Sequence, residues 1–244
     1  MNLIERDPLF GIAKEKFSRW GVDGVLVDLD DTLIYTSEIF RRYMEEYAVQ
    51  VSSLTGIDKE IFAKDLSEIN DREYLNSGVS PKRWDNVVAT LAEKHLSGKE
   101  VILESLPILK KIYVTEPRMR SGAVESLKIF QEIGLKTALV THANVEWTNW
   151  KMDRLGLWDY FDAVVIADEN KMKKPEHWLQ GAVMIDVQPR RCMVVGDNLK
   201  GDILSAASLG MKTAWMPSPW SVYREGEVPA DTIKIQELID LLIS

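Results

Sequence analysis

Short apolar segments recur along the chain and predict the strands of a sheet. They span residues 25–27, 137–140, 163–166, 193–195, 213–215 and 232–235. An amphipathic stretch precedes or follows each of them. In one such stretch Val124, Leu127, Phe130 and Ile133 recur at helical spacing, and Gly134 ends the predicted helix just before the next strand. This alternation predicts an α/β fold in which a parallel sheet carries helices on both faces.

The alternation fails between residues 35 and 120, where the sequence favours helices without strands. Helical segments are predicted over residues 39–51, 58–70 and 84–96. We therefore expect a helical cap domain, residues 35–120, inserted into a core formed by residues 1–34 and 121–244. Ligands of open α/β sheets bind at the carboxyl ends of the strands, so an insertion that follows the first strand is expected to act as a lid. Residues 1–20 are predicted to form a helix that packs on the core.

The charge balance argues against two classes of partner. The 244 residues include 30 Lys and Arg against 38 Asp and Glu, which gives a net charge of −8. Proteins that bind nucleic acid polymers or anionic membranes need a basic surface, so neither partner is expected. No apolar stretch approaches the ~20 residues of a membrane span, and the single cysteine, Cys192, allows no intrachain disulfide. A cytoplasmic location is expected, and the oligomeric state is left open.

Polar side chains follow four of the predicted strands, each at the point where the strand ends. In chain order they are Asp28, Asp30, Asp31 and Thr32; Thr141 and His142; Lys173 and Lys174 before Pro175; and Asp197 and Asp202 after Gly196. Taken singly, each set has a structural explanation as a helix cap or a solvated loop. Parallel strands place their carboxyl ends at one edge of the sheet, and four polar ends there favour a functional site.

The acidic residues at this edge need a positive charge. Asp28 and Asp30 are two residues apart, so strand periodicity predicts that their side chains point the same way. If they converge with Asp197 and Asp202, the repulsion is about 4 kcal/mol per pair at ~4 Å and an effective dielectric of ~20. A hard divalent cation that binds carboxylates and phosphate oxygens fits the preference of Mg²⁺, with Lys174 as a fixed positive charge. The sequence therefore predicts a magnesium site.

The ordered set of motifs resembles the four motifs of the haloacid dehalogenase-like hydrolase superfamily. These motifs are residues 28–33, Thr141, Lys174 with Pro175, and Gly196-Asp197 with Asp202. The resemblance covers essentially the whole chain, because the rhythm of strands and helices and the helical insertion after the first motif also match. It implies a Rossmann-like parallel sheet with a helical bundle as cap.

The resemblance also implies a role for each motif residue. Asp28 would be the nucleophile that forms an aspartyl-phosphate, and Asp30 would protonate the leaving oxygen and later activate water. Thr141 and Lys174 would bind the phosphoryl oxygens. Magnesium would be bound by Asp28, the backbone carbonyl of Asp30 and Asp197, with Asp202 acting directly or through water. Asp31 is left with a structural role.

From these implied roles we expect the chain to be a magnesium-dependent phosphatase that acts on a small phosphorylated metabolite. The acid at Asp30 favours phosphate esters over dehalogenation, because the dehalogenase branch resembles this pattern except at that position. Two features depart from the pattern: His142 stands where Asn is common, and the second Pro after Pro175 is absent. Lys174 is preferred to Lys173 because it directly precedes Pro175. Two alternatives remain, a sugar-phosphate mutase and a non-catalytic regulatory protein that keeps the fold.

Overall fold

The computed structural model describes residues 8–167, 174–218 and 225–243. The chain divides into two compact units, one formed by Met1–Tyr35 with Arg118–Ser244 and the other by Thr36–Pro117. The sequence places the corresponding limits at residues 34/35 and 120/121. That the second unit acts as a cap stays a prediction.

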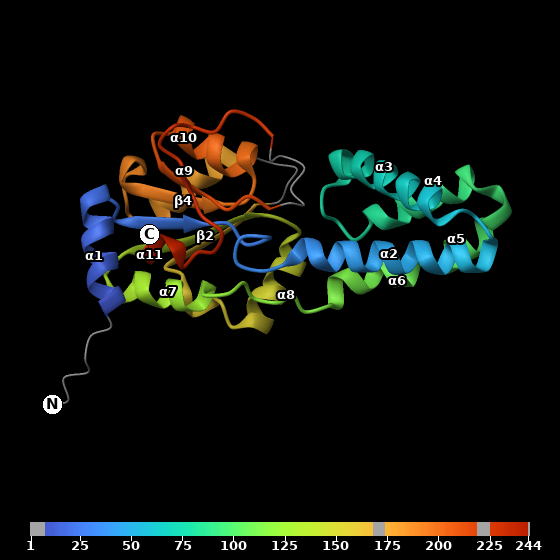
Figure 1. Cartoon of the computed structure of the whole chain (residues 1–244), viewed down its shortest axis with the longest axis horizontal. Helices are drawn as coiled ribbons and strands as arrows, with labels where there is room; N and C mark the ends of the chain where they lie inside the picture. The colour runs from blue at the N-terminus through green and yellow to red at the C-terminus, as the bar shows by residue number, and fades with distance from the viewer. Residues whose placement is uncertain (1–7, 168–173, 219–224, 244) are drawn as a thin grey trace. The chain divides into compact units, whose positions relative to one another are not determined.

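The described residues of the first unit form a six-stranded parallel sheet (Figure 1). Its strands are β1 (Gly24–Val27), β2 (Lys136–His142), β3 (Ala163–Ala167), β4 (Cys192–Gly196), β5 (Lys212–Trp215) and β6 (Ile233–Lys234), in the order β3-β2-β1-β4-β5-β6. The central strand β1 lies between β2 and β4, with Val27 opposite Leu139 and Val195. The predicted α/β fold with a Rossmann-like parallel sheet is confirmed.

Helices cover both faces of this sheet because alternate strand residues point to opposite sides. The helices of this unit are α1 (Pro8–Trp20), α7 (Ala123–Glu132), α8 (Val145–Leu155), α9 (Lys174–Met184), α10 (Ser205–Ser208) and α11 (Asp240–Ile243), with short 3₁₀ turns at Trp158–Tyr160 and Pro189–Arg191 and a π-helix at Leu199–Leu204. Val25 and Val27 pack with Phe17 of α1 and Phe130 of α7. Leu26 packs on the other face, among residues of α9 and α10. Figure 1 shows these two helices on the side of the sheet opposite α7.

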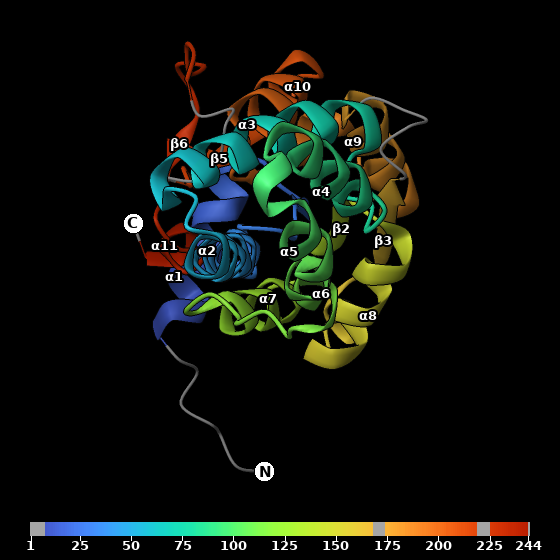
Figure 2. The same cartoon turned by 90° about the vertical axis from the view of Figure 1, so that its right-hand side faces the viewer.

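The second unit is helical throughout its described structure. It comprises α2 (Thr36–Thr55), α3 (Lys59–Ser77), α4 (Arg83–Lys94), α5 (Lys99–Glu104) and α6 (Leu106–Lys110), with 3₁₀ turns at Leu96–Gly98 and Lys111–Val114. Figure 2 views α2 nearly end-on, with α5 and α6 beside it. Its buried residues include Tyr47, Phe62 and Trp84. Asp58 caps α3 by accepting a hydrogen bond from the Ile61 backbone N–H at 3.0 Å.

The two connections between the units run antiparallel where they leave the sheet. The Tyr35 backbone N–H donates to the Arg118 carbonyl at 2.9 Å, and the Arg120 N–H donates to the Leu33 carbonyl at 2.8 Å. The Arg120 guanidinium donates to the Asp31 carbonyl at 2.8 Å and to Glu237 at 3.1 Å. Arg120 therefore links the loop after β1 to the C-terminal part of the chain. The backbone carbonyl of Asp31 takes part in this link.

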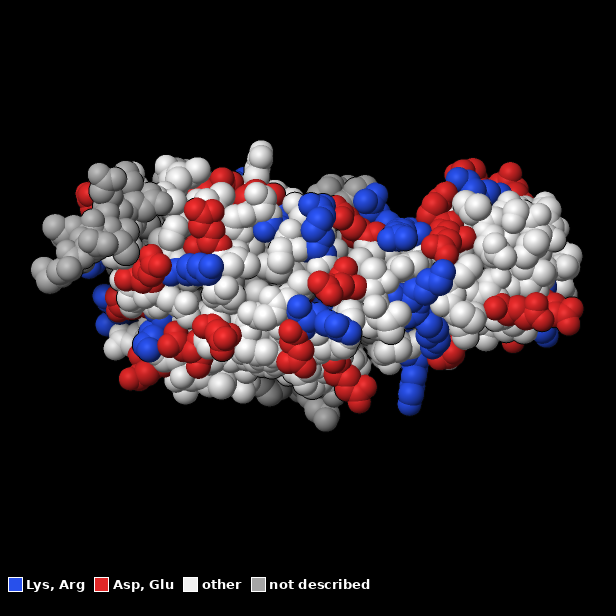
Figure 3. All heavy atoms as spheres, turned by 90° about the horizontal axis from the view of Figure 1, so that it is seen from below, with Lys and Arg blue, Asp and Glu red and all other residues white. Residues whose placement is uncertain are grey.

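Two features of the structure concern membranes and nucleic acid polymers, neither of which is expected as a partner. None of the described helices has the length and hydrophobicity that crossing a membrane requires. On the face of the molecule in Figure 3, Lys and Arg side chains are interspersed with Asp and Glu.

Candidate active site

Asp28 lies directly beyond the carboxyl end of the central strand. β1 ends at Val27, and the Asp28 backbone N–H still donates to the Val195 carbonyl of β4 at 2.9 Å. Beyond it the chain turns tightly, with the Leu33 N–H bonded to the Leu29 carbonyl at 2.9 Å and Asp31 at φ 59°. Strand periodicity therefore does not extend to Asp30, and the premise from which we predicted the direction of its side chain was wrong.

Asp197 and Asp202 follow the neighbouring strand β4. Asp202 lies in the π-helix Leu199–Leu204 rather than beyond a simple turn, and Asn198 caps that helix by accepting from the Gly201 N–H at 2.7 Å. The Asn198 N–H in turn donates to Asp202 Oδ2 at 3.0 Å. Gly196 leaves room for this carboxylate, because a Cβ at residue 196 would overlap Asp202.

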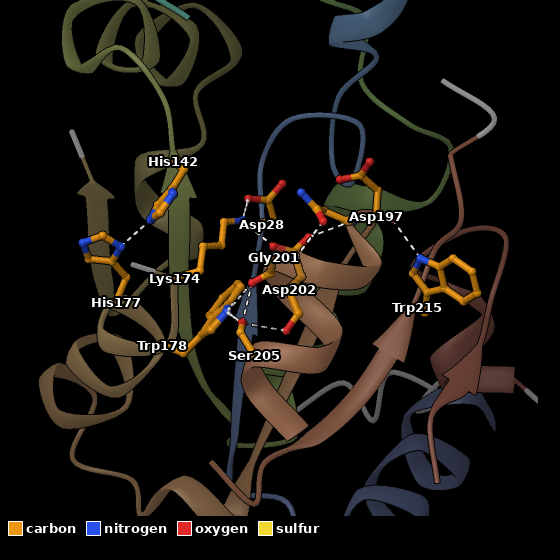
Figure 4. A network of polar contacts seen from close by, with 11 residues as sticks. Asp28, His142, Lys174, His177, Trp178, Asp197, Gly201, Asp202, Ser205 and Trp215 are labelled. Atoms are coloured by element: carbon orange, nitrogen blue, oxygen red, sulfur yellow. Dashed lines mark hydrogen bonds and ion pairs between the residues drawn. The ribbon is translucent and has the colours of Figure 1, made fainter. Parts of the chain in front are cut away.

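Three buried carboxylates meet at this edge of the sheet. Asp28, Asp197 and Asp202 each offer an oxygen, and these oxygens lie within 4.8 Å of one another. Figure 4 shows Asp28 and Asp202 on either side of the Lys174 ammonium, with Asp197 beyond them. The Asp30 carboxylate is not a member of this group, so three of the four acids that we expected to converge do so. An all-oxygen donor set of this kind suits a hard divalent cation.

Lys174 supplies a positive charge within the cluster. It is the first residue of α9 rather than a loop residue, and its ammonium donates to Asp28 Oδ1 at 2.8 Å and also to Asp202 Oδ1. Burial lowers the pKa of Lys174, but attraction to Asp202 and Asp28 outweighs burial and raises the pKa above its usual range. Lys174 is therefore charged at neutral pH. Lys173 lies outside the described residues.

The carboxylates remain under-compensated. Burial raises the pKa of Asp28 to about 7, although the Lys174 charge lowers it in part. Burial, with repulsion from Asp202 and Asp28, also raises the pKa of Asp197 well above its ordinary value. When all three carboxylates are ionised, they and the one ammonium leave two negative charges, which one divalent cation would balance. The donor chemistry and the charge of the cluster thus both fit Mg²⁺.

The Asp30 carboxylate contacts Lys151, a residue that the sequence did not single out. Lys151 lies on α8, its side chain is 0% exposed, and its Nζ is 2.5 Å from Asp30 Oδ1. The two residues are 121 positions apart in the chain. A lysine within an amphipathic helix is normally expected to be exposed to solvent. The pair is therefore recognised from the structure and not from the sequence.

Thr141 and His142 belong to β2, which continues two residues beyond its predicted end. They pair in register with Ile166 and Ala167 of β3, and Thr141 is buried. The His142 Nε2 contacts Nδ1 of the buried His177 on α9 (Figure 4). Nothing in the sequence around His177 indicates this contact, because the two residues are 35 positions apart. The phosphate-binding role of Thr141 stays a prediction.

Both imidazoles are neutral at physiological pH. Burial lowers the pKa of His142 to about 3, helped by the charge of Lys174 and by that of His177 when it is protonated. The pKa of His177 is also lowered by burial and by Lys174, against an opposing effect of Glu176. One ring therefore donates and the other accepts in their shared hydrogen bond.

Two tryptophan side chains form hydrogen bonds that support the backbone near Asp202 and Asp197. Trp178 Nε1 donates to Ser205 Oγ at 3.1 Å, and Ser205 bonds the Gly201 carbonyl in the π-helix that carries Asp202. Trp215 Nε1 donates to the Asp197 carbonyl at 2.8 Å (Figure 4). These bonds fix the backbone on which two of the three acids stand.

Similar proteins are found by sequence and by structure. A sequence model of the haloacid dehalogenase-like hydrolases matches residues 22–210. The chain is 27% identical over 230 residues to glyceraldehyde 3-phosphate phosphatase from Methanocaldococcus jannaschii, which covers 91% of this chain and 97% of the relative. It is 26% identical over 227 residues to the enzyme of the same name from Pyrococcus furiosus, with 90% and 88% covered.

The fold has solved counterparts. A haloacid dehalogenase-like family hydrolase from Xanthomonas campestris matches with a TM-score of 0.71 and 16% identity, over 91% of this chain and 89% of that one. At this identity the likeness concerns the fold alone. Because the family model matches residues 22–210, which are most of the chain, the chain belongs to the haloacid dehalogenase-like hydrolases.

Proposed function

We propose that this protein is a magnesium-dependent phosphatase that hydrolyses a small phosphate monoester through an aspartyl-phosphate intermediate. The observation that carries the proposal is the cluster of buried Asp28, Asp197 and Asp202 with the Lys174 ammonium between two of them. Family membership and phosphatase relatives at 26–27% identity make the chain a hydrolase of phosphate esters. The aspartyl-phosphate intermediate and the need for Mg²⁺ are what we propose beyond this hydrolase activity.

In this proposal Asp28 and Asp30 share the chemistry. A carboxylate oxygen of Asp28 attacks phosphorus, the bond from phosphorus to the ester oxygen breaks, and Asp30 gives its proton to the departing oxygen. Water then attacks phosphorus and loses a proton to Asp30, the bond to Asp28 breaks, and inorganic phosphate leaves. Lys174 and Thr141 hold the phosphoryl oxygens during both steps.

Asp28, Asp197 and the backbone carbonyl of Asp30 would hold the magnesium ion. When bound, the ion neutralises charge on the carboxylates and on the phosphoryl oxygens. Asp202 already accepts from Lys174 through Oδ1 and from the Asn198 N–H through Oδ2. We therefore assign Asp202 chiefly to holding Lys174 in place, with any contribution to the ion made through water.

The substrate class is a small phosphorylated metabolite. Glyceraldehyde 3-phosphate, which the two relatives' names specify, is the first compound to test. A helical unit that closes over the site would exclude water during phosphoryl transfer, and this lid role remains part of the proposal. A cytoplasmic location, and the absence of nucleic acid and membrane partners, likewise stay predictions.

The test is a screen of small phosphate esters with Mg²⁺, with the Asp28→Asn variant as the blank. We expect phosphate release by the wild type that needs Mg²⁺ and disappears in the variant. A mutase would instead convert a hexose phosphate into its isomer and release little phosphate. Equal background release by both proteins across the whole panel would contradict the phosphatase and favour the non-catalytic alternative.

A further inference from the structure

The Lys151 side chain is a buried cation with a specific carboxylate partner. It is 0% exposed, its Nζ lies 2.5 Å from Asp30 Oδ1, and it stands over the Trp147 ring at 4.1 Å from the ring centroid. Taking an ammonium out of water is unfavourable unless an anion and hydrogen bonds compensate for the lost hydration. Asp30 is 25% exposed in its side chain, so the pair joins a buried helix residue to a carboxylate that solvent reaches.

We propose that Lys151 is a positioning residue that assigns different tasks to the two oxygens of Asp30. This inference rests on the proposed function and deepens it. The ammonium anchors Oδ1, which restricts rotation of the carboxylate. A proton on Oδ1 would face the ammonium, so the proton that Asp30 exchanges with substrate and water resides on Oδ2.

The same oxygen of Asp30, Oδ2, gives up a proton in the first step and regains one in the second. In the first step the proton on Oδ2 passes to the ester oxygen as its bond to phosphorus breaks. In the second step the attacking water returns a proton to Oδ2 as the bond from phosphorus to Asp28 breaks. Lys151 keeps its three protons throughout, and its task is to hold the same oxygen of Asp30 toward the reacting groups in both steps.

A salt bridge that only stabilises the fold would act differently on catalysis. Loss of such a bridge would lower the rate for all substrates by one factor. Loss of a bond that positions the acid would depend on the leaving group, because an alkoxide needs a proton as it departs and p-nitrophenolate does not. The ratio of kcat/KM for an alkyl phosphate to that for p-nitrophenyl phosphate therefore distinguishes the two roles, since kcat/KM reports the steps up to bond cleavage.

The experiment measures this ratio in Lys151→Met, Asp30→Asn and the double variant, with glycerol phosphate as the alkyl ester. General acids contribute roughly 10²–10⁴-fold, so we expect Asp30→Asn to lower the ratio by at least about 100-fold and Lys151→Met by at least about tenfold. The double variant should match Asp30→Asn alone, because Lys151 acts only through Asp30.

The controls separate this inference from the proposed function. Asp28→Asn should be inactive on both esters, and activity in that variant would contradict the proposed function whatever Lys151 does. Lys136→Met removes a lysine that pairs with Asp162 at 3.0 Å at the opposite end of β2 and should leave the ratio unchanged. If Lys151→Met does not fold, Lys151→Gln should shift the ratio in the same direction. An equal loss on both esters, or additive losses in the double variant, would overturn the positioning role.

Discussion

At the scale of single residues, one methyl group added at Gly196 would reach the acidic cluster of Asp28, Asp197 and Asp202. The Asp202 carboxylate occupies the space where a Cβ would stand. Gly196→Ala is therefore expected to destabilise the fold by about 1–3 kcal/mol, the usual cost of overpacking, and to lower phosphate release by displacing Asp202 from Lys174. Chemical denaturation and phosphate assays check both effects.

Gly11 in α1 offers the matched control, because an added Cβ there meets no heavy atom within 4 Å. Gly11→Ala should stabilise the protein by about 0.5–1 kcal/mol, since alanine loses less conformational freedom in a helix. It should leave activity unchanged. Equal behaviour of the two variants would refute the packing argument at Gly196.

His142 leads to a prediction about pH and stability. Its pKa is about 3 in the folded protein against 6.5 in the reference state, so the unfolded chain takes up a proton first as the pH falls. Its contribution to stability is complete above pH 6.5 and is lost as the pH falls toward 3. The free energy of unfolding should therefore decline more steeply in wild type than in His142→Asn between about pH 6.5 and about pH 4.5. Parallel curves from urea denaturation would contradict this.

Single residues also show what the sequence could reveal. Asp28 and Asp197 were found because each directly follows an apolar strand, and that signal is local in the chain. Lys151 and His177 were missed because their partners lie 121 and 35 positions away. Neither residue carries a local pattern that differs from an ordinary helix position.

At the scale of elements, the π-helix Leu199–Leu204 positions Asp202, and Asn198 holds its first turn. Asn198→Ala removes the bond to the Gly201 N–H and should cost about 1 kcal/mol, as for other caps. Because Asp202 in turn holds Lys174 beside Asp28, we also expect weaker Mg²⁺ binding, seen as a smaller rise of Tm when Mg²⁺ is added.

Asp58→Ala is the control for this prediction. Asp58 caps α3 in the helical unit in the same manner, through the Ile61 N–H. A similar loss of stability with an unchanged response to Mg²⁺ is expected. If both variants, or neither, lost the response to Mg²⁺, the link between the π-helix and the metal site would be wrong.

The elements themselves were largely predictable. Apolar runs located the strands, and the segments predicted at residues 39–51, 58–70 and 84–96 lie within or overlap α2, α3 and α4. The ends were less well predicted, because polar residues can continue a strand when a neighbour pairs with them. Thr141 and His142 extend β2 in this way through pairing with β3. The π-helix has no sequence signal that we recognise.

At the scale of the whole molecule, the chain combines a Rossmann-like core with a separate helical unit, Thr36–Pro117. The acids come together because β1 and β4 are neighbours in the sheet, although 169 positions separate Asp28 from Asp197. The order of motifs and the insertion after the first strand were visible in the sequence. The substrate was not, because the residues that recognise it do not follow from the motifs.

We propose that Asp28 takes up a phosphoryl group in the presence of Mg²⁺, and this can be tested without knowledge of the substrate. Beryllium fluoride mimics a phosphoryl group on a nucleophilic carboxylate, and ¹⁹F NMR detects the bound form. We expect bound resonances in wild type that require Mg²⁺ and are absent from folded Asp28→Asn. Folded wild type without bound resonances, or binding that persists in Asp28→Asn, would contradict it.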